Sequence, residues 1–212
     1  MILKSDIIAK LLEESADPGA PDPLVITPSP PDLVELAKSG SASIDIRLGT
    51  WFMNLRQARM PQLAIDEPES QPQLTKMHYV PFGSEYYLHP GNFVLSVTLE
   101  WIRIPKNLAA YVIGKSSRGR RGLIIATATG VHPGFKGCLT LELSNVGELP
   151  IAIKPGMEIC QLFLHRVETE NEELDRSLFI GLRRPTIGKI ELDPIARKLA
   201  EAYSSMTGSS PP

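Results

Sequence analysis

Cysteine is scarce in this 212-residue sequence, which contains only Cys138 and Cys160. Two cysteines are too few for a disulfide scaffold or a cysteine-rich zinc site, and they favour a reducing compartment. Long apolar runs are also missing, since none approaches the roughly 18 to 20 residues that span a bilayer. The first fifteen residues contain acids and no apolar signal core, so we expect no secretory signal peptide. Together these absences predict a cytoplasmic protein that does not enter a membrane.

An excess of charge of one sign is absent as well. The sequence has 22 Lys and Arg residues against 24 Asp and Glu residues, for a formal net charge of -2. A general nucleic-acid or membrane-surface binder would show a basic excess. The P-loop, the Rossmann fingerprint and the G-x-S-x-G elbow are missing. Zinc-dependent nucleobase deaminases need an H-x-E and a P-C-x-x-C group, and neither occurs here.

Short alternating strand patterns, separated by turn residues, make up most of the chain. Alternation is found over residues 43–48, 86–104, 139–144, 151–153 and 158–164. The turn residues between them include His89 to Asn92, Gly147 to Pro150 and Pro155-Gly156. This spacing predicts a mainly β fold, a sandwich or a barrel, with helices only as appendages. On the polar face of the first strand, Asp45 and Arg47 form either an ion-pair network or part of a site.

The ends of the chain carry the helical patterns. Residues 5–15 predict an amphipathic helix with Ser5 as its N-cap and a stripe of Ile7, Ile8, Leu11 and Leu12. Six prolines in residues 17–32 predict a loop or extended arm, followed by a helical turn over 33–38. Residues 57–76 predict a surface loop, 193–203 a helix and 204–212 a disordered tail. We therefore predict one domain over 1–190 with a Pro-rich insertion at 17–32, and a helix and tail over 191–212.

The candidate chemistry is concentrated between Ile113 and Asn145. Eight consecutive residues there contain four cations and two hydroxyls, and they are Lys115, Ser116, Ser117, Arg118, Gly119, Arg120, Arg121 and Gly122. Guanidinium and hydroxyl groups suit phosphate oxygens, and glycine lets backbone N–H groups approach a ligand. A solvated basic turn is the alternative, although the segment interrupts apolar strands instead of lying in a polar linker.

Glu142 is the candidate acid of the same region. Leu139, Leu141 and Leu143 commit one face of its strand to a core, so Glu142 shares the other face with Thr140 and Ser144. That carboxylate either faces water or, if the face lines a pocket, acts as a general base. Both cysteines lie in apolar strand patterns, and we interpret them as packed thiols instead of nucleophiles.

These motifs resemble those of the metal-independent dCTP deaminases of the dUTPase-like superfamily. The similarity runs nearly end to end, through MILKSDII, SIDIRL at 43–48, LHPGNFVLSVTLEWIRIP at 88–105, GKSSRGRRGL at 114–123 and HPGFKGCLTLELSN followed by LPIAIKPGMEICQL. The resemblance implies a distorted β-barrel of the dUTPase-like type with short N- and C-terminal helices. It also implies a homotrimer whose active sites lie at subunit interfaces.

The same resemblance implies a deoxynucleoside triphosphate substrate, with Mg2+ bound through its phosphates and no zinc. Glu142 would be the catalytic acid/base, taking a proton from the water that attacks C4 of cytosine and returning protons to N3 and the departing ammonia. The substrate-binding residues would be Lys115, Ser116, Ser117, Arg118, Gly119, Arg120, His132, Thr140, Leu141, Gln161, Arg183 and Thr186.

Two stretches depart from the family pattern. The usual T-A-G-x-I-D run reads Thr127-Ala-Thr-Gly-Val-His132, one residue shorter, so His132 stands at the position of a family aspartate. In the related dUTPases that aspartate orients the water that attacks the phosphate chain. The tail motif, commonly Y-x-G-Q-R-G-P-T, reads Phe179-Ile-Gly-Leu-Arg-Arg-Pro-Thr186, which keeps Arg183 and Thr186 but loses the tyrosine and the glutamine.

These residues are compatible with three functions. The first is deamination of dCTP to dUTP and ammonia. The second is a dUTP diphosphatase or a bifunctional enzyme, against which His132 counts because histidine cannot act as a carboxylate. The third is a nucleotide-binding paralogue with weak or no catalysis, as the altered loop and tail suggest.

Overall fold

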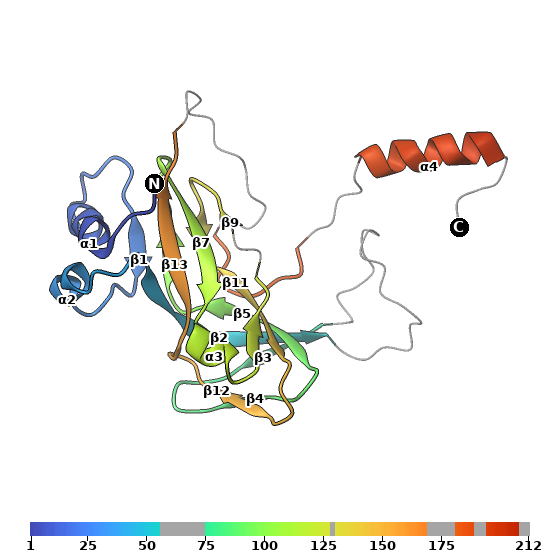
Figure 1. Cartoon of the computed structure of the whole chain (residues 1–212), viewed down its shortest axis with the longest axis horizontal. Coiled ribbons are helices and arrows are strands. Elements are labelled where there is room, and N and C mark those ends of the chain that lie inside the picture. The colour runs from blue at the N-terminus through green and yellow to red at the C-terminus, as the bar shows by residue number, and fades with distance from the viewer. Residues whose placement is uncertain (56–74, 128–129, 169–180, 189–193, 208–212) are drawn as a thin grey trace.

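The computed structural model describes residues 1–55, 75–127, 130–168, 181–188 and 194–207 (Figure 1). Its helices are α1 (Ser5–Glu14), α2 (Leu33–Lys38), α3 (Ser116–Gly119) and α4 (Pro194–Thr207). Its strands are β1 (Val25–Thr27), β2 (Ile44–Leu55), β3 (Thr75–Tyr79), β4 (Tyr86–Leu88), β5 (Phe93–Thr98), β6 (Trp101–Arg103), β7 (Leu108–Gly114), β8 (Leu123–Ile125), β9 (Gly130–Val131), β10 (Lys136–Gly137), β11 (Thr140–Asn145), β12 (Ile151–Ile153) and β13 (Glu158–Arg166). The predicted mainly β fold is confirmed.

An eight-stranded sheet in the order β8-β11-β5-β2-β13-β7-β9, with β3 added beside β2, forms the body of the molecule. The sheet curls like half a barrel, so β7 comes back to β8 from the other flank. At this seam a Cβ atom added to Gly114 would lie 3.5 Å from the Ile125 side chain. Helix α3 follows β7 at once and leads into β8, so the predicted basic segment bridges the seam (Figure 1).

The core lies inside this curl and follows the alternation of the strands. Ile46, Leu48 and Phe52 of β2 are fully buried, and so are Leu141 and Leu143 of β11. On the other face of β11, Thr140, Glu142 and Ser144 are half-buried. The predicted division of this strand into a core face and a second face is therefore confirmed, and it places Glu142 outside the core.

Helices α1 and α2 pack against each other beside β1 (Figure 1). Both were predicted, and Asp32 caps α2 by accepting a hydrogen bond from the Glu35 N–H at 2.8 Å. The prediction that Ser5 caps α1 is wrong, because Lys4 is the N-cap residue and Ser5 is the first helical residue. The Ser5 hydroxyl instead donates to the Ala37 carbonyl of α2 at 3.5 Å.

Several predicted boundaries differ from the structure. The Pro-rich insertion contains the short strand β1, which pairs with β6 at the edge of a three-stranded sheet. Residues 86–104 form three strands, β4, β5 and β6, where two were expected. The predicted loop over 57–76 lies largely outside the described residues, and its last two residues belong to β3.

The C-terminal helix is present as α4 and lies apart from the sheets (Figure 1). It extends to Thr207, so the predicted disorder is wrong for residues 204–207. The rest of the predicted tail, and residue 193 at the start of the predicted helix, lie outside the described ranges. In the part of the chain that the structure describes, no helix has the length and apolar character needed to cross a membrane.

Candidate active site

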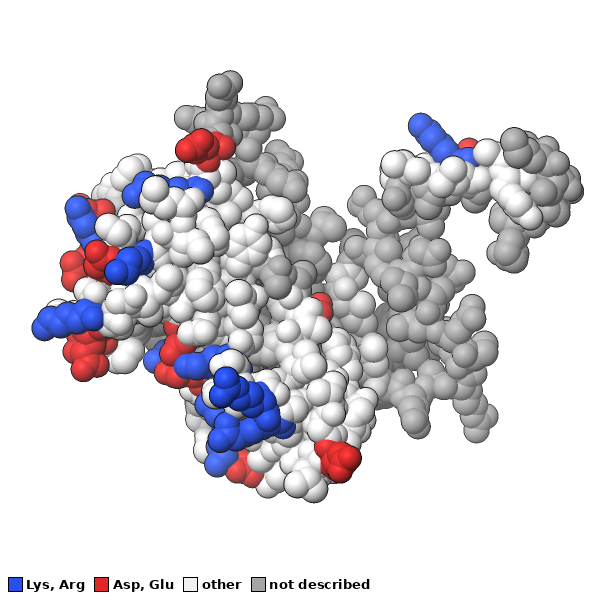
Figure 2. All heavy atoms as spheres, in the orientation of Figure 1, with Lys and Arg blue, Asp and Glu red and all other residues white. Residues whose placement is uncertain are grey.

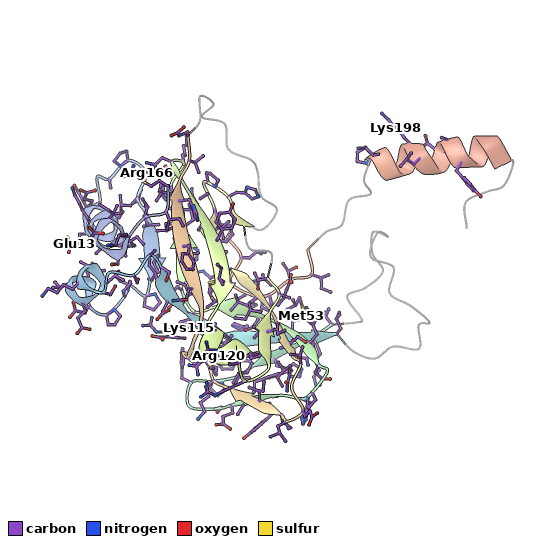
Figure 3. All side chains as sticks on the ribbon, viewed as in Figure 1. Glu13, Met53, Lys115, Arg120, Arg166 and Lys198 are labelled. Atoms are coloured by element: carbon purple, nitrogen blue, oxygen red, sulfur yellow. The ribbon has the colours of Figure 1, made fainter. Side chains whose placement is uncertain are left out.

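The basic segment is exposed at the seam of the sheet. Figure 2 shows a group of Lys and Arg side chains where α3 lies in Figure 1. The predicted loop contains one short helical turn, α3, whose N-cap residue is Lys115. Ser116, Ser117 and Arg120 are exposed, whereas Lys115 and Arg118 are half-buried. Lys115 and Arg120 are labelled in Figure 3 at the two ends of this turn.

Two carboxylates hold the Lys115 ammonium. Its Nζ lies 2.7 Å from Asp45 Oδ2 on β2 and 2.7 Å from Glu158 Oε2 on β13. Burial would lower the pKa of Lys115, but its hydrogen bonds to these two acids raise the pKa above its ordinary value. Lysine therefore stays charged, and the three side chains together carry one negative charge.

Gln161 belongs to the same cluster. Its Nε2 donates to Asp45 Oδ1 at 3.1 Å and to Ser43 Oγ at 3.2 Å. Asp45 is thus fixed through both oxygens, one by Gln161 and the other by Lys115. The structure brings together Lys115 and Gln161, two of the predicted nucleotide ligands, through a carboxylate that lies between them.

Glu158 also fixes the start of α3 through its backbone. The sheet register shifts between Glu158 and Cys160, and the Glu158 carbonyl accepts a hydrogen bond from Arg118 Nε at 3.2 Å. The Lys115 N–H donates to the Ile159 carbonyl at 3.1 Å. This irregularity in β13 therefore holds the basic turn by three separate contacts.

The arginines of the basic turn differ in how many of their side-chain N–H groups already donate hydrogen bonds within the protein. Arg121 Nη1 donates to the Ser117 carbonyl at 2.7 Å, and Arg118 bonds the Glu158 carbonyl. Arg120 makes no side-chain hydrogen bond or ion pair within the described ranges. Its guanidinium, together with the exposed hydroxyls of Ser116 and Ser117, is the group best suited to bind phosphate oxygens.

Glu142 is held in place by its backbone. Its N–H donates to Thr127 Oγ1 at 3.0 Å, and its carbonyl accepts from the Ala126 N–H at 2.9 Å. Directly opposed residues of antiparallel strands share a face, so Glu142 lies beside Leu95 of β5 and, one strand further, Met53 of β2. The side chains of both neighbours are buried. The carboxylate side chain makes no hydrogen bond or ion pair in the described part of the chain.

The seam brings the strands that carry the two halves of the site close together. Lys115 follows Gly114, which faces Ile125, and Ile125 is paired with Leu143 next to Glu142. Thr140 and Leu141 lie on the same strand as Glu142, with Leu141 in the core. Among the described residues, no hydrogen bond or ion pair links the Glu142 carboxylate to the basic turn.

His132 lies elsewhere on the sheet. It is exposed and follows β9, which pairs with β7 at the opposite end of the strand order from β8 and β11. Its carbonyl accepts the Phe135 N–H at 3.2 Å, and Gly134 between them has a φ of 78°. The chain thus turns at Pro133-Gly134, and within the described residues the structure joins His132 to no other candidate side chain.

The tail residues lie next to the start of β11. Cys138 donates its N–H to the Leu182 carbonyl at 2.8 Å, which places Arg183 close to the residues that precede Thr140. Arg183 is exposed, and Thr186 Oγ1 accepts the Gly188 N–H at 3.3 Å. Phe179, the first residue of the tail motif, lies outside the described ranges.

The thiols are buried as predicted, fully for Cys160 and partly for Cys138. Burial raises the pKa of Cys160 to about 12 and raises that of Cys138 as well. Thiols that stay protonated are poor nucleophiles. No group of three or more His, Cys, Asp or Glu side chains suited to a metal ion occurs in the described part of the chain.

Glu158 and Ser43 were not identified from the sequence as parts of the site. Glu158 lies 43 positions from Lys115, just before an apolar strand, and nothing local in the sequence relates the two. Asp45 was recognised as either an ion-pair residue or a site residue, and the structure shows its ion pair with Lys115, itself a candidate site residue. Arg47, grouped with it, instead pairs with Glu100.

The sequence matches known proteins over most of its length. A family model described as dCTP deaminase-like matches residues 2–167. The chain is 37% identical over 199 residues to a protein of Dictyoglomus turgidum named "dCTP deaminase, dUMP-forming", covering 91% of this chain and 96% of that one. A protein of the same name from Acidothermus cellulolyticus is 40% identical over 187 residues, covering 85% of this chain and 90% of that one.

Among solved structures, the fold is similar to that of a 2'-deoxycytidine 5'-triphosphate deaminase from Agrobacterium tumefaciens. The TM-score is 0.56 and the sequence identity 22%, and the match covers 78% of this chain. The chain spans about half of that protein, since 48% of its length is covered. At this identity the likeness concerns the fold alone, and it agrees with the half-barrel described above.

Proposed function

Because the chain belongs to the dCTP deaminase-like family, we propose that it deaminates dCTP, with Glu142 as the general acid/base. The observation that carries the proposal is the position of Glu142. Its carboxylate has no partner among the described residues, stands next to Leu95 and is fixed by backbone hydrogen bonds to Ala126 and Thr127. A carboxylate held beside apolar side chains, with oxygens available, can accept and return a proton.

The proposed reaction consumes one water and releases one ammonia. Glu142 takes a proton from water as the water oxygen bonds to C4 of the cytosine, and it passes this proton to the ring nitrogen N3. Glu142 then takes the second water proton from the new hydroxyl on C4 and gives it to the amino group, so the C4–N bond breaks, C4=O forms and ammonia leaves. The product of this step is dUTP, and no protein-bound metal takes part.

We assign the triphosphate to the basic turn. Arg120 and the hydroxyls of Ser116 and Ser117 are exposed, and Lys115 keeps one N–H beyond the two that it gives to Asp45 and Glu158. Mg2+ would be bound by the phosphates, where it would neutralise part of their charge. Such an ion needs few or no protein ligands.

Purified protein incubated with dCTP and Mg2+ tests the proposal through the release of ammonia and a uracil nucleotide. Release of neither would overturn it. Binding of dCTP in a calorimeter without turnover would instead support the nucleotide-binding paralogue.

We further propose a homotrimer whose active sites are shared between subunits. In support, Tyr111 and Ile113 expose apolar surface on β7, the strand that leads to Lys115. Ile2, which is bridged to His165 of the neighbouring β13, is exposed as well. Light scattering should give the mass of three chains of 23.3 kDa.

Mixed assemblies should then recover activity that two variants lack alone. E142Q removes the acid/base from one subunit and R120M removes the phosphate ligand from another. Co-expression of the two should restore part of the deaminase activity, because some interfaces receive both wild-type residues. If each variant forms trimers but the mixture stays inactive, the shared site is refuted.

A second candidate function is production of dUMP, and the names of the relatives favour it. It would require a water held for attack on the phosphate chain, where the family resemblance places an aspartate and this chain has the exposed His132. Chromatography of the products separates the two candidates. Accumulation of dUTP supports deamination alone, whereas dUMP and pyrophosphate in step with ammonia support the second function.

The H132D variant should gain pyrophosphate release from dUTP. A carboxylate at this position could accept a proton from water, and we expect a gain of about 10²-fold, the low end for general base catalysis. H89D, which changes another exposed histidine in a turn, is the matched control and should show no gain. Rapid pyrophosphate release by the wild-type protein would contradict the role assigned to His132.

A further inference from the structure

The tail segment 181–188 makes a ring contact with the sheet. The Cζ atom of Arg184 lies 4.2 Å from the centroid of the Trp51 ring. Trp51 on β2 also packs against Tyr79 of β3, with ring centroids 5.1 Å apart and an interplanar angle of 56°. A guanidinium at this distance over an indole is attracted by the negative face of the ring.

Backbone contacts fix the residues just before Arg184. The Gly181 N–H donates to the Lys136 carbonyl at 2.6 Å, and the Cys138 N–H donates to the Leu182 carbonyl at 2.8 Å. Gly137 lies between these two partners with a φ of 144°, and a Cβ there would lie 3.1 Å from the Leu182 carbonyl oxygen. The close approach therefore depends on this glycine, because a side chain would clash with the tail.

The Arg184 contact lies on the sheet face that carries Glu142. Trp51 and Met53 are two residues apart on β2 and so point to one side. Met53 is paired with Leu95, and Leu95 with Glu142, and paired residues share a face. The tail thus attaches at two places, through Gly181 and Leu182 to residues 136 and 138 just before β11, and through Arg184 to Trp51 on the face that carries Glu142.

Arg184 is also a departure from the tail motif of the family, which has glycine at this position. Its neighbours Arg183 and Thr186 are the residues of that motif that this chain retains. We propose that Arg184 is a positioning residue, whose stacking on Trp51 fixes the tail backbone so that Arg183 points at the bound nucleotide. The role of Arg183 rests on the proposed function, whereas the Arg184–Trp51 contact does not.

Kinetics of matched variants test the effect on the nucleotide. R184A should raise KM for dCTP by about 2- to 5-fold, the range that an exposed cation–π contact supports, with kcat nearly unchanged. R184K keeps the charge and should recover part of the loss. W51L should raise KM as much as R184A does. The double variant should have the same KM as W51L, because both substitutions remove the same contact between Arg184 and Trp51.

Additive effects of R184A and W51L would overturn the proposal, as would a KM for R184A equal to that of the wild type. W101F is the control, because Trp101 lies on β6, where it pairs with Thr27, and among the described residues Arg184 stacks on Trp51 and not on the Trp101 ring. It should leave KM unchanged.

Proteolysis tests the contact without any activity. Trypsin can cleave after Arg183, whereas the bond after Arg184 resists because proline follows. W51L leaves this sequence intact, so faster cleavage after Arg183 in W51L than in the wild type and W101F would report release of the tail. Equal cleavage rates would refute the contact, whether or not the protein deaminates dCTP. Faster cleavage with unchanged KM would refute only the positioning role.

Discussion

Replacing Glu142 with glutamine is expected to lower kcat for dCTP deamination by about 10²- to 10⁴-fold, the loss that follows removal of a general acid/base. Glutamine has nearly the same shape but can neither accept the proton of the attacking water nor return it. The bonds that fix residue 142, to Thr127 and Ala126, involve its backbone only and remain. KM should therefore change little, and steady-state ammonia release at saturating dCTP measures the effect.

E148Q is the matched control for this substitution. Glu148 lies six residues further along, exposed in the turn after β11, and its neutralisation changes the net charge by the same amount. It should deaminate dCTP like the wild type. An E142Q variant whose kcat stays close to that of E148Q would remove Glu142 from the mechanism, even if the protein deaminates dCTP.

The position of Glu142 could be predicted because it depends on local alternation. Leu141 and Leu143 had to face a core, so their neighbour had to face the other side, and this is what the structure shows. What lies on that other side could not be predicted. Leu95 and Met53 come from strands 47 and 89 residues earlier in the chain, as the numbering shows (142 − 95 = 47 and 142 − 53 = 89), and only the sheet register brings them there.

In the basic turn, too, contacts between residues far apart in the sequence could not be predicted. Its composition predicted phosphate binding and gave every cation the same role. The structure distinguishes them, because Lys115 is paired with Asp45, 70 residues away, and with Glu158, whereas Arg120 makes no such pair among the described residues. The capping prediction at Ser5 failed for a related reason: its hydroxyl contacts α2, a tertiary partner that a local pattern does not reveal.

The sequence did not predict the break between strands β5 and β6, which occurs at the buried acid Glu100. Apolar residues continue after β5 at Leu99 and Trp101, so the sequence predicted one continuous strand through β5 and β6. Glu100 between them is buried, and its Oε2 accepts the Arg47 N–H at 2.9 Å while its Oε1 lies 3.0 Å from Arg47 Nη1. The side chain of Glu100 thus satisfies a backbone group of β2 where the sheet is interrupted.

Removing the guanidinium of Arg47 from its ion pair with Glu100 is expected to lower stability far more than removing an exposed cation. R47M leaves the Glu100 carboxylate buried without a counter-charge, and we expect a loss of about 3–5 kcal/mol in the free energy of unfolding. R103M is the control, because Arg103 pairs with Asp22 at the same 3.0 Å but with both side chains partly exposed. Its loss should stay below about 1 kcal/mol.

The destabilisation by R47M should shrink in acid, and this dependence identifies the buried charge as its cause. Burial raises the pKa of Glu100, against the opposing hydrogen bonds and charge of Arg47, and loss of the guanidinium raises the pKa further. Above the ordinary carboxyl pKa the folded state then binds more protons than the unfolded state, so stability falls as pH rises through the folded pKa. Urea denaturation should show the difference between R47M and wild type narrowing from about pH 7 to about pH 5. The R47M/E100Q double variant has no carboxyl group at position 100, so its stability difference from the wild type should not narrow in this way. If the stability loss of R47M is independent of pH, the lost packing of the Arg47 stem causes it, and not the unpaired carboxylate.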